Sequence, residues 1–231
     1  MKIYGLQKLT LLDYPKKTAC TIFTGGCNFR CPFCHNALLV TDIDNSNTYT
    51  EEEILDFLAK RKGLLDGVCI TGGEPLMQND IAEFIKKIKE LGYKVKLDTN
   101  GTFPEKLAEL LKNRLVDYVA MDIKNSKEKY AETAGIKNIN ISDIEKSINL
   151  LKSSDVDYEF RTTVVKEFHT EADIEKIAEW IKGAKSYFLQ NFEDSGNLIG
   201  ENLTPVGKQI LDKMKTQAKA FVQNTQIRGI K

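Results

Sequence analysis

The chain has 231 residues, 42% of them hydrophobic, and its 33 Lys and Arg residues balance 33 Asp and Glu residues. This length is sufficient for one large α/β domain with a substantial core, and the balanced charge gives no sign of nucleic-acid binding. No apolar run approaches the roughly 20 residues that span a bilayer, and the N-terminus lacks the apolar region of a signal peptide. We therefore expect a cytoplasmic protein, a single domain over residues 1–231, that binds neither nucleic acid nor membrane.

Short apolar runs typical of strands alternate with amphipathic helical stretches along the whole chain. Six strands are predicted, at residues 19–24, 67–71, 94–98, 118–123, 157–165 and 186–192. Nearly continuous apolar strands separated by helices favour a parallel sheet with helices on its outer face. Six strand–helix units are too few for a closed eight-stranded barrel, so the sequence predicts an open, partial barrel.

Residues that commonly begin helices precede the amphipathic stretches. Thr50 and Glu53 form the pattern of a capping box. Further helix starts are predicted at Asn79, Pro104, Ser142 and Thr170, and a last helix from Thr204-Pro205 to about Ala218. A short strand at residues 221–227 then ends the fold, and the polar segment 42–48 is predicted to be a loop.

Three of the five cysteines, Cys27, Cys31 and Cys34, lie in one loop with the spacing C-x3-C-x2-C. Thiolates are soft ligands that select zinc, copper(I) or iron–sulfur clusters. Zinc in structural sites normally has four protein ligands, and iron–sulfur clusters usually have four cysteines. Three thiolates leave one iron of a cubane cluster free to bind a substrate or cofactor. The spacing alone also allows a zinc knuckle with His35 or a distant group as fourth ligand.

The cysteine spacing, with Phe33 just before the last cysteine, resembles the signature of the radical S-adenosylmethionine (SAM) enzymes. The following His35-Asn36 and the earlier Leu12-Asp13-Tyr14-Pro15 resemble the glycyl-radical-enzyme activases of that superfamily. Among them, the chain most resembles the anaerobic ribonucleoside-triphosphate reductase activating proteins, with the pyruvate formate-lyase activating enzymes as near relatives. The resemblance covers nearly the whole chain. It implies a partial (β/α)6 TIM-like barrel with a C-terminal helix and short strand, and one 4Fe–4S cluster on the three cysteines.

Three polar motifs lie at the ends of predicted strands: Gly72-Gly73-Glu74, Asp98-Thr99 and Asp122. Parallel sheets of this kind bind ligands at the carboxyl ends of their strands. Adjacent carboxylates repel each other unless a positive charge lies between them. Taken alone, each motif could be an ordinary turn or cap. The resemblance implies that the SAM-binding residues are Phe33, Asn36, Gly72, Gly73, Glu74, Asp98, Thr99 and Asp122, with a monovalent cation near Asp98 and Asp122.

Several other residues have a less specific interpretation. Cys20 and Cys69 lie within apolar strands and are predicted to be buried core residues. His169 is predicted to lie on the surface before a helix. Lys124 is expected to face either a bound adenosine, a partner peptide or solvent. The chemistry implied by the resemblance needs no general acid or base, so no such catalytic residue is assigned.

Two segments depart from the relatives. Residues 13–18 replace the Asp-Gly-Pro-Gly-x-Arg pattern of formate-lyase activases, in a loop that faces the partner peptide in that family. Leu189-Gln190-Asn191-Phe192 replaces Leu-Pro-Tyr-His at the sixth strand end, so Gln190 or Asn191 is expected to substitute for the histidine.

The resemblance implies a reaction between two proteins. A cluster reduced by flavodoxin or ferredoxin cleaves SAM, and the 5′-deoxyadenosyl radical generates a glycyl radical on a partner enzyme. Anaerobic ribonucleotide reductase is the leading partner. Three alternatives remain: a radical SAM enzyme acting on a small molecule such as a pterin, similar to 7-carboxy-7-deazaguanine synthase; an electron-transfer module; and a zinc-bound interaction domain.

Overall fold

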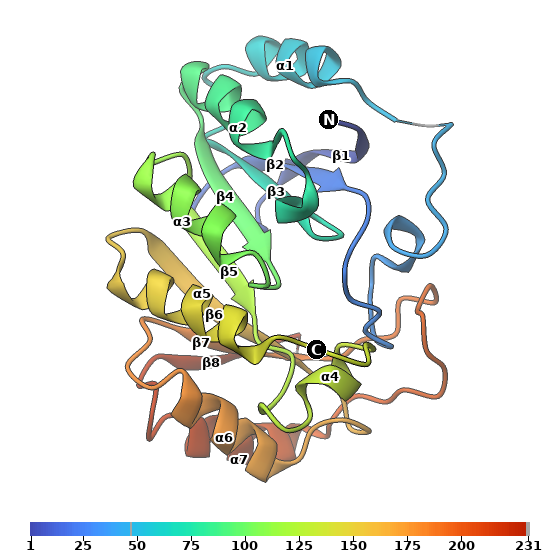
Figure 1. Ribbon diagram of the computed structural model, residues 1–231, viewed down its shortest axis with the longest axis vertical. Helices are drawn as coiled ribbons and strands as arrows, with labels where there is room; N and C mark the ends of the chain where they lie inside the picture. The colour runs from blue at the N-terminus through green and yellow to red at the C-terminus, as the bar shows by residue number, and fades with distance from the viewer. Residues whose placement is uncertain (47, 230–231) are drawn as a thin grey trace.

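The computed structural model of the protein describes residues 1–46 and 48–229. One sheet of eight strands, in the order β1 to β8, organises the fold (Figure 1). The strands are β1 (Ile3–Thr10), β2 (Ala19–Thr24), β3 (Gly67–Gly72), β4 (Lys94–Thr99), β5 (Tyr118–Asp122), β6 (Asp157–Val164), β7 (Tyr187–Asn191) and β8 (Thr225–Arg228). β1 pairs with β2 in antiparallel fashion, and every later pair is parallel. The expected α/β partial barrel is confirmed.

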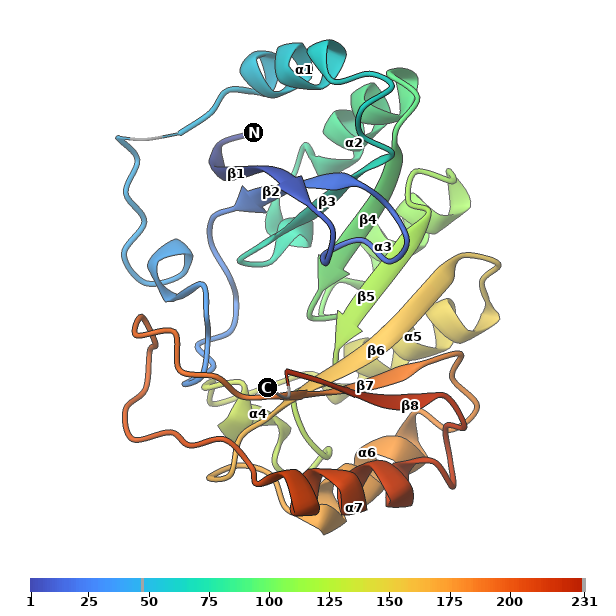
Figure 2. The same ribbon diagram turned by 180° about the vertical axis from the view of Figure 1, so that it is seen from behind.

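The sheet curls without closing, and β1 and β8 form its two edges in the described part of the chain (Figure 2). Helices cover the outer face of the curled sheet (Figure 1). They are α1 (Glu51–Lys60), α2 (Ile81–Glu90), α3 (Pro104–Lys112), α5 (Ile141–Ser153), α6 (Glu171–Trp180) and α7 (Lys208–Ala218). The short helix α4 (Tyr130–Thr133) lies beside the loop after β2, and short 3-10 helices occur at Ala37–Leu39 and Pro75–Met77. Within residues 1–46 and 48–229, no helix combines the length and apolar character needed to cross a bilayer.

The predicted helix starts are partly confirmed. The capping box of Thr50 and Glu53 is present before α1, and Thr170 forms one with Asp173 before α6. α2 begins after Asp80 and α5 after Asn140, not at Asn79 and Ser142 as predicted.

The start predicted for the last helix is wrong by several residues. α7 begins at Lys208, because Pro205 forms an antiparallel bridge with Val165 and the Thr204 carbonyl accepts from the Lys166 N–H at 3.1 Å. The predicted loop at 42–48 has no helix or strand in residues 42–46 and 48, and Asn47 lies outside the described residues.

β1 was not predicted from the sequence. It is an edge strand whose last residues before Thr10 are exposed, and irregularities at Ile3/Gly5 and Gln7/Thr10 interrupt its register with β2. An edge strand that pairs with one neighbour and has an irregular register lacks the regular alternation of apolar and polar residues by which strands are recognised in a sequence. The final strand predicted at 221–227 is present as β8, but it begins four residues later, at Thr225, and ends at Arg228.

Alternate residues of the strands face opposite sides of the sheet, as the period of two requires. One set is apolar, fully buried and in the same core as the helices, and includes Val68, Ile70, Val95, Leu97, Val119, Met121, Phe160 and Leu189. The other set carries charge: Lys96 and Asp98 of β4 lie near Arg161 of β6. The inside of the partial barrel is therefore polar, and its charged groups lead to the carboxyl ends of the strands.

Candidate active site

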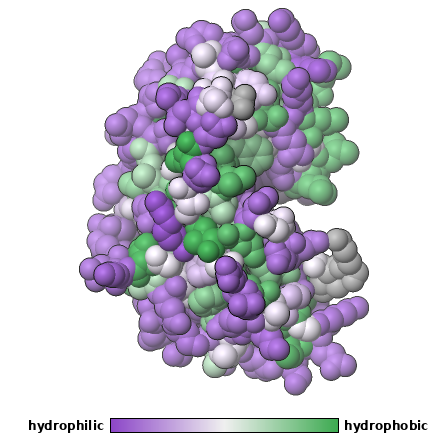
Figure 3. Space-filling model, turned by 90° about the vertical axis from the view of Figure 1, so that its right-hand side faces the viewer, coloured by the Kyte–Doolittle hydropathy of each residue, from purple (hydrophilic) through white to green (hydrophobic). Residues whose placement is uncertain are grey.

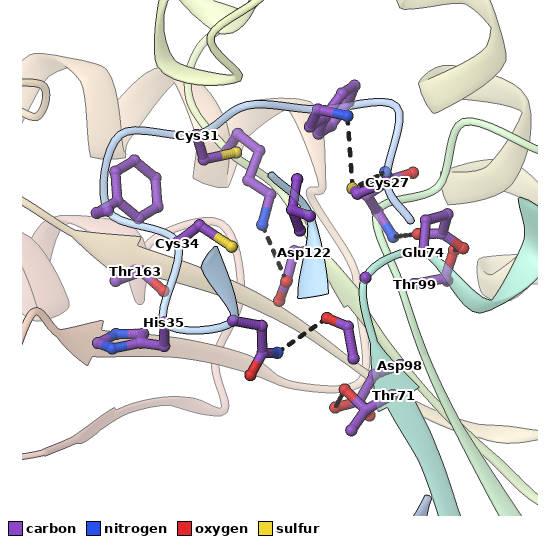
Figure 4. A pocket seen from close by; sticks show the side chains of 18 of the residues that line it. Cys27, Cys31, Cys34, His35, Thr71, Glu74, Asp98, Thr99, Asp122 and Thr163 are labelled. Atoms are coloured by element: carbon purple, nitrogen blue, oxygen red, sulfur yellow. Dashed lines mark hydrogen bonds and ion pairs between the residues drawn. The ribbon is translucent and has the colours of Figure 1, made fainter. Parts of the chain in front are cut away.

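A cavity lies at the carboxyl ends of the parallel strands, between those ends and the loop after β2 (Figure 4). It encloses about 870 Å³ of space, part of which is open to solvent. All eleven residues assigned to the cluster or to SAM line it: Cys27, Cys31, Phe33, Cys34, Asn36, Gly72, Gly73, Glu74, Asp98, Thr99 and Asp122. Segments far apart in the sequence therefore meet at one place.

The cysteine loop is held by backbone contacts at several points. The Gly26 N–H donates to the Leu39 carbonyl at 2.8 Å, and the Arg30 N–H donates to the Ala134 carbonyl at 2.9 Å. Gly135, in the left-handed region at φ 65°, lies so close that a Cβ there would be 2.0 Å from the Arg30 carbonyl oxygen. The turn after α4 thus supports the middle of the loop.

The three cysteine side chains face the same cavity as free thiols (Figure 4). Burial raises the pKa of Cys27 and Cys34, and raises that of Cys31 to about 12. The charge of Lys124 opposes this rise at all three thiols. In residues 1–46 and 48–229, no three His, Cys, Asp or Glu side chains converge as ligands of one ion. Three thiols spread around a cavity fit a cluster held by thiolates on separate irons.

Glu74 is the most deeply buried carboxyl group of the cavity, at 1% exposure. It accepts hydrogen bonds from the Asn100 N–H at 2.6 Å, the Thr99 hydroxyl at 2.8 Å and the Leu76 N–H at 3.0 Å. Burial raises the pKa of Glu74 to about 7 even though these three donors favour the carboxylate. Its charge is therefore sensitive to any cation or amine that enters the cavity.

Gly72 and Gly73 allow two backbone segments to approach each other. A Cβ on Gly73 would lie 1.9 Å from the Gly26 carbonyl oxygen, and one on Gly72, at φ 113°, would lie 2.3 Å from the Thr24 carbonyl oxygen. The segments are joined by hydrogen bonds from the Gly73 N–H to the Thr24 carbonyl and from the Glu74 N–H to the Gly26 carbonyl. These glycines therefore fix Glu74 against the cysteine loop.

Asp98 and Asp122 lie on either side of Arg161. The Arg161 guanidinium donates from Nε to Asp122 at 2.9 Å and from Nη1 to Asp98 at 3.2 Å. Burial would raise the pKa of both carboxyl groups. Arg161 and Lys96 hold the pKa of Asp98 below its usual value, and Arg161 with Lys124 lowers that of Asp122 to about 2.

The positive charge expected between these two carboxylates is thus a guanidinium. A monovalent cation is not needed to bring them together. Sequence reasoning missed Arg161, although Glu159, Arg161 and Thr163 at alternate positions of an apolar strand were a signal that this strand had a polar face.

Asn36 and Phe33 have structural partners as well as a place in the cavity wall. The Asn36 side chain donates from Nδ2 to the Gly72 carbonyl at 2.8 Å, joining the cysteine loop to the end of β3. The Phe33 ring is 3% exposed and lies 5.9 Å from the Phe168 ring. His35 stacks on Phe192 at 5.9 Å.

Lys124 faces the cavity and pairs with Asp122 at 3.0 Å, so it is not a solvated lysine. Of the two residues expected to replace the relatives' histidine, Gln190 lines the cavity. Asn191 instead accepts from the Val206 N–H through its side-chain oxygen at 3.1 Å.

His169 is buried at 4% exposure, and the prediction of a surface position is wrong. Its Nε2 lies 2.8 Å from the Lys124 carbonyl oxygen, which can only accept, so Nε2 carries a proton and donates to it, while Nδ1 lies 3.1 Å from the Val165 nitrogen and 3.2 Å from the Val165 carbonyl oxygen. Burial lowers the pKa of His169. The neutral ring thus joins the loop after β6 to the loop after β5, a role that the chain position beside a helix start did not reveal.

Comparisons with known proteins agree with this geometry. Residues 21–181 match the model of the Radical SAM superfamily. A Methanocaldococcus jannaschii protein whose name describes a glycyl-radical enzyme activating enzyme is 39% identical over 241 residues, covering 99% of this chain and 96% of that protein. The pyruvate formate-lyase-activating enzyme of Clostridium pasteurianum is 32% identical over 129 residues, 54% of this chain and 52% of the enzyme. The crystal structure of Streptococcus suis SuiB bound to S-adenosylmethionine has a TM-score of 0.68 at 17% identity, over 89% of this chain and 49% of that one.

Proposed function

Because this chain belongs to the radical SAM superfamily, we propose that it is an activating enzyme that generates a glycyl radical on a partner enzyme. Enzymes of this superfamily use a 4Fe–4S cluster and SAM. The observation that carries the activase assignment is the similarity, along almost the whole chain, to a protein with that name. Anaerobic ribonucleotide reductase is the partner we propose, and flavodoxin or ferredoxin the electron donor.

The residues of the cavity have distinct roles in this proposal. Cys27, Cys31 and Cys34 hold the cluster, and Glu74 accepts from the amino group of SAM beside it. A reduced cluster bound by these cysteines would supply the electron for reductive cleavage of SAM, and the radical derived from SAM would take a hydrogen atom from the target glycine. The protein itself orients the reactants and excludes water. No side chain is required as a general acid or base.

Four charged side chains that line the cavity, Asp98, Asp122, Lys124 and Arg161, hold one another in place. Arg161 holds Asp98 and Asp122 in place through the two contacts described above, and Lys124 pairs with Asp122 at 3.0 Å. Both carboxylates are therefore ionised at neutral pH and already have cationic partners. We propose that Asp98, Thr99 and Asp122 contact SAM from this fixed arrangement.

The opening of the barrel between its two edge strands favours a protein, rather than a small molecule, as the substrate. β1 and β8 are separate edges of the sheet (Figure 2), and one side of the space-filled outline is notched about midway along the long axis (Figure 3). An extended peptide with the target glycine could enter from this side.

The test of the proposal is anaerobic incubation with SAM and a low-potential reductant, with and without anaerobic ribonucleotide reductase. We expect 5′-deoxyadenosine to form in amounts that depend on the reductase, and a glycyl radical signal on the reductase by electron paramagnetic resonance (EPR). Failure of every glycyl radical enzyme tested to gain a radical, together with turnover of a pterin, would establish the small-molecule alternative instead.

The affinity for SAM should increase as the pH is raised from about 6 to about 8. The pKa of Glu74 is about 7 because of burial, and the carboxylate accepts a hydrogen bond more strongly than the protonated acid. Glu74→Gln should bind SAM about ten- to hundredfold more weakly at the higher pH, equivalent to one charge-assisted contact of roughly 1.5–3 kcal/mol.

The measurement is anaerobic calorimetric titration of SAM into both proteins across this pH range. SAM's own amino group titrates equally in both experiments, so the ratio of the two affinities isolates Glu74. A ratio that stays constant with pH would show that Glu74 does not ionise in contact with SAM.

A further inference from the structure

Asn100 connects the cysteine loop to the end of β4. It directly follows Thr99, lines the cavity and is 5% exposed. Its backbone N–H donates to Glu74, as described above, while its side chain reaches across to Asn28 and Cys27. One residue therefore touches both the carboxylate assigned to SAM and a cysteine assigned to the cluster.

The hydrogen bonds determine the orientation of the Asn100 amide. The backbone N–H and the hydroxyl of Thr102 approach Oδ1 at 3.0 and 2.6 Å. A backbone N–H can only donate, so the atom that faces it is the amide oxygen. The NH2 group must then point the other way, towards the cysteine loop.

The NH2 group has two hydrogens to place. One goes to Oδ1 of Asn28 at 2.8 Å, and Asn28 in turn donates from Nδ2 to the Thr102 hydroxyl at 2.9 Å. For the other hydrogen, the acceptor that the described residues provide is Sγ of Cys27, 3.9 Å from the nitrogen. A buried amide hydrogen without a partner is costly, so this contact completes the bonding of Asn100.

We propose that Asn100 tunes the reduction potential of the cluster by donating a hydrogen bond to the Cys27 thiolate. The inference rests on the proposed assignment of Cys27 as a cluster ligand. Reduction adds one negative charge to the cluster, and a donor at a ligating sulfur stabilises the more negative state. Asn100 therefore raises the potential, and with the Phe29 N–H, 3.4 Å from the same sulfur, it gives Cys27 two donors.

Asn100→Asp and Asn100→Ala test the proposal. In Asn100→Asp, one carboxylate oxygen still accepts from Thr102, and the other replaces the NH2 group that donates to Cys27. Asn100→Ala removes both the accepting oxygen and the donating NH2 group. Neither change removes the backbone N–H that donates to Glu74. We expect both variants to bind about four irons per chain and to have a more negative midpoint potential in an EPR-monitored titration. A tenfold lower equilibrium constant for reduction corresponds to a shift of about 59 mV for one electron.

Asn28→Ala is the matched control. It removes the contact between Asn28 of the cysteine loop and Asn100, whereas the Asn28 side chain itself bonds to Asn100 and to the Thr102 hydroxyl and, among the described residues, to no sulfur. We expect a much smaller shift in this variant. An equal shift would mean that loop position, not the donor to Cys27, sets the potential.

The other possible results distinguish the proposed role of Asn100 from the assignment of the three cysteines as cluster ligands. Asn100 variants with full iron content and the wild-type potential would overturn the role of Asn100 alone. Loss of iron from Asn100→Asp, which keeps the Thr102 contacts, would assign Asn100 to holding the cluster instead of tuning it, and would also overturn the proposal. Absence of iron from the wild-type protein would overturn the cluster assignment itself.

Discussion

Replacing any one of Cys27, Cys31 or Cys34 with Ala should remove the cluster and abolish SAM cleavage. The three thiols face one cavity, and a cluster held by three cysteines has no spare protein ligand there. The wild-type protein, reconstituted without oxygen, should be brown and contain about four irons per chain. Iron content, visible absorption and 5′-deoxyadenosine formation check this expectation.

Cys20→Ala and Cys69→Ala are the matched controls, and both should keep the cluster. These residues are fully buried in β2 and β3 and are not among the residues that line the cavity. Eight irons per chain, or loss of the cluster from Cys69→Ala, would show that a second set of thiols binds metal. Stoichiometric zinc in a colourless protein would instead favour the interaction domain.

Asp98→Asn should lower the free energy of unfolding by about 3–5 kcal/mol, because it leaves the buried Lys96 ammonium without its carboxylate, whereas Arg161 keeps Asp122. Lys96 is 2% exposed and ion-pairs with Asp98, and the guanidinium of Arg161 lies 3.2 Å from the same carboxylate. Cys69 Sγ, 3.6 Å from the Lys96 ammonium, cannot replace that charge while burial keeps the thiol protonated. Anaerobic denaturant unfolding measures the difference.

The double variant Lys96→Met with Asp98→Asn is the control for this prediction. It removes both charges, and replacing a whole buried pair by neutral groups is often nearly neutral for stability. We therefore expect it to recover most of the lost free energy. Wild-type stability in Asp98→Asn itself would mean that this carboxylate serves the ligand alone.

This ion pair changes how SAM binding should be tested. From the sequence, Asp98 and Glu74 are equivalent carboxylates at strand ends, and substitution of either is expected to weaken SAM binding. In the structure, Asp98 is paired with two cations, whereas Glu74 is held by three neutral donors. Glu74→Gln therefore reports on the ligand more directly, since it leaves no cation unpaired.

Much of the architecture could be predicted because its signals are local. β2 was predicted with its observed bounds, and β3 to β7 to within one residue at each end. Apolar runs, capping residues and glycines act over a few neighbouring positions, so they can be recognised without knowledge of the fold. β1 and the start of α7 were predicted wrongly because contacts distant in sequence shape them. Tyr49 pairs with Ile3 of β1, and Val165 pairs with Pro205 before α7.

The sequence by itself determined which residues could carry the chemistry, because the three cysteines share one loop and the other motifs lie at strand ends. Only the tertiary structure decided what contacts them. Arg161 reaches Asp98 across 63 positions of sequence, Asn100 reaches Cys27 across 73, and His169 reaches the Lys124 carbonyl across 45. Such partners come together because parallel strands bring their carboxyl ends to one edge, and no local pattern records which side chains then meet.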